Sequence, residues 1–144
     1  MTTTAEYLRL ARAKIEQPEG WAQGFFAYRP ATSETWRKTI VHHGQALHAT
    51  DIGDTKAVCW CATGAVFAVT GKAPMVAERP LAFLTAALRE ITQAGPTQNL
   101  QMKGVVAFND APHRRHEEVL NLFDVAIRLA EQDEQADDHP EAHL

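Results

Sequence analysis

The segment AVCWCATGAVFAV, residues 57–69, constrains the fold of this chain more than any other stretch. Its apolar residues form two stripes at helical spacing, so the pattern predicts a helix that is apolar on nearly every side. Asp54 is a suitable N-cap for this helix, and Gly71 is a suitable residue to end it. Such a helix belongs at the centre of a helical bundle. Gly64 lowers its helix propensity, which indicates that another segment approaches closely there.

Three amphipathic helices are predicted around this central helix. Thr3 and Glu6 have the spacing of a capping box, which predicts a helix over residues 4–17. A second amphipathic pattern begins near Pro80 and ends at Gly95. The last helix is expected from about residue 114 to residue 133.

Residues 18–54 have no sustained helical period and contain scattered glycines and prolines. They predict a long irregular connection between the first two helices. Within it, GFFAY and KTIVHH could pair as a small hairpin, or SETWRKTIVHH could form a helix capped by Ser33. The sequence leaves both alternatives open. A structureless loop of this length is uncommon in a compact domain, so part of it is expected to carry function or to cover the core.

The length and composition of the chain define its class. Its 144 residues are enough for one domain with a core that needs no disulfide or metal. We therefore predict a mainly α, single-domain bundle of about four helices over residues 1–132, followed by an acidic, disordered tail over residues 133–144. The N-terminus lacks the apolar segment of a secretory signal, and no stretch approaches the roughly 20 apolar residues that span a bilayer. A cytoplasmic location without membrane association is expected.

Three short patterns occur in order: WAQG, WCATGA and FNDAPHRRHEEV. Together they resemble a family of small bacterial and phage proteins of unknown function, whose members share W-x-x-G, W-C-x-x-G-A and W/F-N-D-x-P-x-R-x-x-x-E-V motifs. The resemblance supports a common fold, admits a phage or prophage origin and implies no activity. It marks the following residues: Trp21, Gly24, Trp60, Cys61, Gly64, Ala65, Phe108, Asn109, Asp110, Pro112, Arg114, Glu118 and Val119.

One departure from the family pattern concerns the start of the last helix. Arg115 stands where family members have a threonine, so the capping box that would include Glu118 lacks its hydroxyl group. Asp110 or a backbone turn is then expected to satisfy the first amides of this helix, or the helix starts earlier.

The two cysteines are interpreted as small buried hydrophobes. On one helix Cys59 and Cys61 would lie about 200° apart, and the chain has no third cysteine to complete a zinc motif. The histidines lack the H-E-x-x-H spacing of zinc proteases and are expected on the solvated surface. We therefore predict no metal site and no cofactor.

An alternative hypothesis is a small thiol-dependent hydrolase or transferase. Cys61 would be its nucleophile, and His113 or His116 would be the base. Asn109 or Asp110 would orient the imidazole. An imidazole activates a thiol by converting it to the thiolate. The interior of an apolar helix argues against this hypothesis, because burial raises the pKa of a thiol.

The FNDAP segment supplies the candidate binding residues. Asn109 and Asp110 are natural turn and capping residues before a helix. A functional interpretation joins them with Arg114 in a polar cluster beside the rings of Trp21 and Trp60, which would bind a small ligand or a side chain of a partner. Arg114 would offer a planar fork to a carboxylate or phosphate, or would simply pair with Asp110.

The sequence thus favours a non-enzymatic interaction or regulatory protein that binds another protein, with a homodimer as one possibility. This hypothesis predicts a buried Cys61 and an exposed apolar patch elsewhere, whereas an enzyme requires Cys61 in a cleft near an imidazole. Nucleic-acid binding is disfavoured by the net charge of −4. It would need Arg29, Trp36, Arg37 and Lys38 on one surface.

Overall fold

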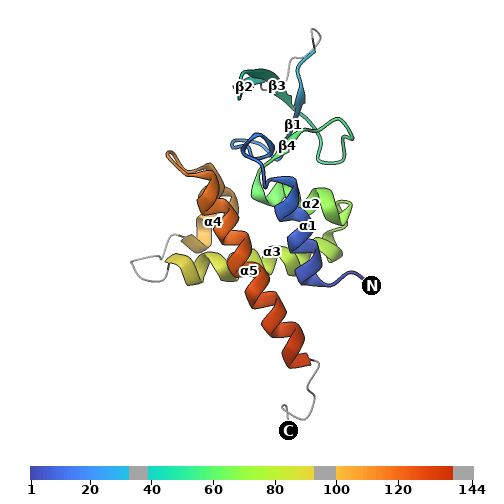
Figure 1. The fold of residues 1–144 in the computed structure, drawn as a ribbon, viewed down its shortest axis with the longest axis vertical. Helices are drawn as coiled ribbons and strands as arrows, with labels where there is room; N and C mark the ends of the chain where they lie inside the picture. Colours follow the sequence, from blue (N-terminus) through green and yellow to red (C-terminus); the bar gives the residue numbers. More distant parts are fainter. Residues whose placement is uncertain (33–38, 93–99, 138–144) are drawn as a thin grey trace.

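The computed structural model describes residues 1–32, 39–92 and 100–137 and contains both helices and strands (Figure 1). The elements in these ranges are α1 (Thr4–Lys14), the 3-10 helix η1 (Pro18–Gly20), β1 (Ala27–Pro30), β2 (Thr39–His42), β3 (Gln45–Ala49), β4 (Cys59–Trp60), α2 (Ala62–Thr70), α3 (Pro74–Thr92), α4 (Leu100–Asp110) and α5 (His116–Asp137). Figure 1 shows the strands gathered at one end of the helices. The fold is mixed α/β, and the predicted mainly α bundle of about four helices is wrong.

The strands form an antiparallel sheet in the order β2-β3-β1-β4. β2 and β3 are joined by His43 and Gly44, whose φ angles of 50° and 80° suit the tight turn of a two-residue hairpin. The KTIVHH segment therefore contributes a strand over Thr39–His42 rather than a helix. Its partner is β3, and the strand from the GFFAY region lies on the other side of β3. Residues 33–38, which include the expected Ser33 cap, lie outside the described residues.

The predicted central helix is divided into a strand and a shorter helix. β4 takes Cys59 and Trp60, which pair with Tyr28 and Ala27 of β1. α2 then spans Ala62–Thr70 and is capped by Gly71, as expected. The expected N-cap Asp54 is wrong, because Cys61 caps the helix after the strand β4. Helical periodicity cannot separate a short buried strand from a buried helix, because both are continuous apolar runs. Here Cys59 and Trp60 form a strand rather than a helix because they pair with β1.

The other helices differ from their predicted bounds. α1 starts after Thr3, whose hydroxyl accepts the Glu6 N–H at 3.1 Å, and it ends at Lys14. α3 begins at Pro74 and carries Pro80 inside it, fully buried in the core. α4 occupies a stretch expected to be a connection, and α5 continues to Asp137, into the expected tail. Residues 138–144 lie outside the described residues.

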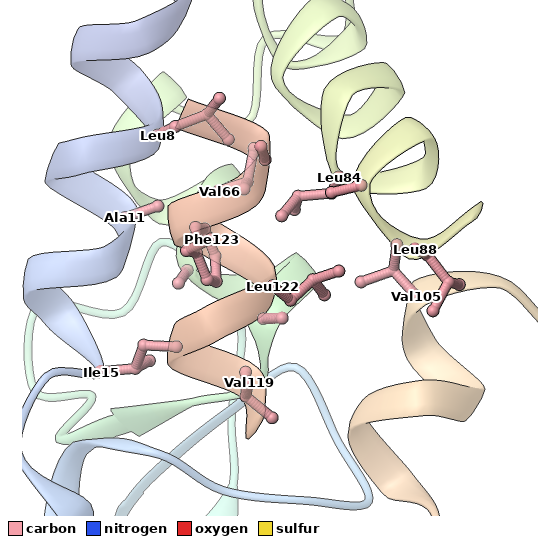
Figure 2. Close-up of a cluster of buried hydrophobic side chains, with 14 of the residues drawn as sticks. Leu8, Ala11, Ile15, Val66, Leu84, Leu88, Val105, Val119, Leu122 and Phe123 are labelled. Carbon is pink, nitrogen blue, oxygen red and sulfur yellow. The ribbon is translucent and has the colours of Figure 1, made fainter. Parts of the chain in front are cut away.

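Two apolar clusters form the interior. The larger one lies between the helices, and Figure 2 shows its side chains converging on Phe123 and Leu122 of α5. The smaller one is formed mainly by residues of the strands and consists of Ala22, Tyr28, Leu47, Ala49 and Cys59. None of the helices in the described ranges combines the length and apolarity needed to cross a membrane.

Candidate functional site

Asn109 is fully buried near the end of α4, between the helices and the sheet. Its Oδ1 accepts the indole N–H of Trp21 at 2.7 Å and the backbone N–H of Ala62 at 3.0 Å. Its Nδ2 donates to the carbonyl oxygen of Ala22 at 3.0 Å and to Oδ1 of Asp110 at 2.9 Å. A side-chain amide has two donors and one oxygen with two lone pairs, so these four bonds use its whole capacity.

The residues next to Asn109 extend this network to the loop after η1. The backbone N–H of Gly24 donates to Oδ1 of Asp110 at 3.0 Å, and Gln23 Nε2 donates to the carbonyl oxygens of Asn109 and Ala111. The WAQG and FNDAPHRRHEEV patterns of the sequence are therefore in contact in the folded protein. The term Asn109 clasp is used below for the bonded group Trp21, Ala22, Gly24, Ala62, Asn109 and Asp110.

The second sequence pattern reaches the clasp through the start of α2. Cys61 is the N-cap of this helix, and its Sγ accepts the Gly64 N–H at 3.3 Å. The Cys61 N–H donates to the carbonyl oxygen of Phe26 at 3.2 Å. A Cβ on Gly64 would lie 2.8 Å from the carbonyl carbon of Phe26 and closer still to its oxygen. Only glycine fits here, because the Phe26 carbonyl occupies the space of a side chain.

Arg114 lies apart from Asn109 and holds the turn before α5. Its Nε donates to the Phe108 carbonyl oxygen at 2.7 Å, and its guanidinium carbon lies 3.7 Å from the centre of the Phe108 ring. Its Nη1 lies 3.4 Å from Glu118 rather than pairing with Asp110. Oε1 of Glu118 accepts the Arg115 N–H at 2.8 Å, which lowers the Glu118 pKa and caps α5 without the threonine hydroxyl or Asp110.

Both cysteines are free and buried. Burial raises the pKa of Cys61 to about 11, although the hydrogen bond from Gly64 opposes this shift, and the nearby Asp110 carboxylate adds to it. Burial also raises the pKa of Cys59 to about 12. The expected direction therefore holds for Cys61, but its predicted place inside the helix is wrong because the residue lies at the N-terminus of α2.

The two histidines of the sequence hypotheses lie in different surroundings. His116 Nε2 bonds to the carbonyl oxygen of Ile15 at 2.6 Å, and its ring centre is 5.7 Å from that of Trp21. His113 is exposed. No described contact joins Cys61 to either histidine. Trp60 accepts the Ala22 N–H through its backbone oxygen, while its indole nitrogen is buried without a partner among the described residues.

Two of the cavities in the described part of the chain lie at the end of α4 and include Asp110 in their lining. The larger, about 590 Å³, is lined by Thr92, Ala107, Phe108, Asp110, Ala111, Pro112 and Arg114. The smaller, about 100 Å³, is lined by Gly24, Phe25, Phe26, Cys61, Val106 and Asp110. Sequence reasoning missed Phe25 and Val106, although the paired phenylalanines of GFFAY were visible. Within the described ranges, no group of three His, Cys, Asp or Glu side chains is placed to hold a metal ion.

The geometry defines a small mixed α/β protein in which one asparagine joins the three sequence patterns. A family model described as "Family of unknown function (DUF6197)" matches residues 1–129, so the chain belongs to this family. Comparisons with curated proteins and with solved structures gave no match.

Proposed function

We propose that this chain is a non-catalytic protein-interaction module of the cytoplasm, whose partner binds in the 590 Å³ cavity beside Phe108 and Arg114. This cavity is termed the Phe108 hollow. Its volume, open to solvent beside an aromatic ring and a guanidinium group, is the observation that carries the proposal. Binding sites are typically hollows with mostly apolar walls and a few polar groups.

The residues that suggested catalysis support this assignment because they are occupied elsewhere. Asn109 has no free hydrogen-bonding capacity, and His116 is bonded to a backbone carbonyl. The Cys61 thiol is only 2% exposed, and its raised pKa keeps it protonated near neutral pH. A thiol attacks well only as the thiolate. Two free cysteines also suit a reducing compartment.

The partner's chemistry follows from the Arg114 side chain. Its described bonds use Nε and Nη1, and a guanidinium group has five N–H donors. Nη2 therefore offers donors to an incoming carboxylate, while the Phe108 ring and the side chains of Ala107 and Pro112 offer apolar contact. We expect a peptide segment with an apolar residue next to an acidic one.

A random peptide library displayed on yeast, selected against the folded protein, tests this proposal. Enriched peptides should carry the apolar and acidic pair. Calorimetry should show that Ala107→Arg, which fills the hollow, weakens their binding at least about tenfold. Ala82→Arg places the same side chain at an exposed position of α3 and should leave binding unchanged. Equal binding to both variants, or no enrichment, would refute the proposal.

A second copy of the chain is one partner to be distinguished in the same experiment. If the hollow binds another copy, light scattering should show a mass that rises with concentration and falls back to the monomer in Ala107→Arg. If the mass is that of the monomer throughout, the partner is a different protein.

A further inference from the structure

The smaller cavity beside Asp110 has an unusual lining for its size. It is termed the Phe25 pocket and is formed by Gly24, Phe25, Phe26, Cys61, Val106 and Asp110. Phe25 and Val106 are 43% and 42% exposed, which is high for large apolar residues. The rings of Phe25 and Phe26 lie 6.0 Å apart between centres and are tilted by 54°. At about 100 Å³ the pocket is well below the roughly 300–1,000 Å³ of sites for drug-sized ligands, so its occupant is a single small group.

The charge in this pocket is negative. Asp110 is the one ionisable carboxylate among the described lining residues, and both of its described hydrogen bonds reach Oδ1. None of the ion pairs in the described ranges includes Asp110. Its charge acts on its surroundings, because it contributes to the raised pKa values of both Cys61 and Tyr28. The negative charge of Asp110 favours a cation beside it, whereas burial, the largest cause of both raised pKa values, acts against a charge of either sign.

An anion is a poor fit, even though α2 begins beside the pocket. The first amides of a helix can bind an anion when they are free. Here the Ala62 N–H donates to Asn109 Oδ1, and the Gly64 N–H donates to Cys61 Sγ. These donors are therefore already used by the protein.

We propose that the Phe25 pocket binds an alkylammonium group. The Phe25 and Phe26 rings supply aromatic surface, which attracts cations through the negative face of the ring. Asp110 supplies the opposite charge, and Val106 with Cys61 receives the attached carbon atoms. The group can come from a free amine or from a lysine side chain of a partner, and both present the same cation. The pocket shares Asp110 with the Phe108 hollow, but its other lining residues are different, and the proposal does not depend on the hollow.

Titrations with n-butylammonium and tetramethylammonium chloride, followed by amide chemical shifts in NMR, test the proposal. Saturable shifts are expected at Gly24, Phe25, Cys61 and Val106 at concentrations up to about 100 mM, where even a weak millimolar site is filled. The neutral analogue tert-butanol should bind at least about fivefold more weakly than the cations. A peptide with one acetylated N-terminus and one lysine distinguishes the sources. Its binding identifies a partner's side chain, and binding of the small amines alone identifies a free amine.

Three variants make the outcome specific. Asp110→Asn keeps an oxygen for the Gly24 and Asn109 donors and removes the charge, so it should weaken cation binding at least about tenfold. Phe25→Leu keeps an apolar side chain and should weaken it severalfold. Glu78→Gln makes the same change of charge at an exposed position of α3 and should have no effect.

Equal affinity for tert-butanol and the cations would overturn the proposal, and so would unchanged affinity in folded Asp110→Asn. The absence of saturable shifts would overturn it as well. Arg114→Gln, which alters the Phe108 hollow, should leave cation binding intact, so failure of one site can be separated from failure of the other.

Discussion

The indole N–H of Trp21 donates to the side-chain oxygen of Asn109 at 2.7 Å, across 88 positions of the sequence. The same oxygen accepts the Ala62 N–H, so one buried atom fixes the loop after η1 and the start of α2 against α4. The motifs that first suggested a binding site therefore hold the helices and the sheet together. The surface beside them, rather than Asn109 itself, is available to a ligand.

Replacing Asn109 with alanine should destabilise the protein by about 3 kcal/mol or more. The substitution leaves the Trp21 and Ala62 donors and the Ala22 carbonyl oxygen buried without their partner. Unfolding in denaturant measures the free energy of unfolding of this variant. Asn121→Ala, at an exposed position of α5, should change it by less than about 0.5 kcal/mol. Similar values for the two variants would mean that the clasp does not stabilise the fold.

A Gly64→Ala variant should lose at least about 3 kcal/mol of stability, because its Cβ would collide with the Phe26 carbonyl group. Gly71→Ala provides the matched comparison. Gly71 has a φ of 69° but nothing within 4 Å of an added Cβ. The alanine there should cost about 1 kcal/mol of stability, which comes from backbone strain alone. Thermal unfolding of both variants separates the two effects. A Gly64→Ala variant as stable as Gly71→Ala would contradict the close approach of Phe26.

Alkaline pH should weaken the fold through Cys61. Burial raises its pKa from the ordinary value of 9.0 to about 11 in the folded chain. The unfolded chain therefore releases its proton first, and stability that is complete below pH 9 is lost as the pH rises through about 11. Cys61→Ser retains a capping side chain and should flatten this part of the curve, measured as the free energy of unfolding against pH. An unchanged slope would contradict the burial of the thiol.

The burial and raised pKa of Cys61 also control how fast its thiol reacts. A thiol reagent near neutral pH should label it far more slowly in the folded chain than in denaturant, because it is 2% exposed and protonated. Fast, pH-sensitive labelling of the folded protein would instead support the thiol enzyme and would refute the non-catalytic proposal.

Acid pH should weaken the fold through Asp54. Its carboxylate accepts the Thr50 hydroxyl at 2.7 Å, the Lys56 N–H at 2.9 Å and Arg29 Nη1 at 3.1 Å, and these bonds lower its pKa below the ordinary 3.8. Stability is then present above pH 3.8 and is lost as the pH falls through the lowered value. Asp54→Asn should reduce the acid-dependent loss more than Asp51→Asn does in the same loop. Equal effects would contradict this role.

The sequence predicted those elements that depend on local signals. The Thr3 cap, the amphipathic pattern of α5 and the end of α2 at Gly71 are all encoded by neighbouring residues. The sheet was not predictable in this way, because β4 exists only through its pairing with β1, about 30 positions earlier. α4 was missed because Gly104, with a φ of 67°, interrupts the helical pattern.

The candidate site was predictable to a similar extent. The sequence patterns pointed to Trp21, Asn109 and Asp110, which the structure places together. They also suggested that Arg114 belongs to this cluster, but it stacks on Phe108 and lies beside Glu118. Spacing along a chain shows which residues a turn can bring near each other and cannot show which side of the turn each one faces.

The distances in sequence between the partners of Asn109 also affect how the protein is made. Trp21 and Ala62 leave the ribosome 88 and 47 residues before the oxygen that both require. A nascent chain that stops short of Asn109 has polar groups at this junction with no acceptor, and it also lacks α5 and Phe123. We expect the sheet and the first helices to remain open to proteases until α4 and α5 have been synthesised.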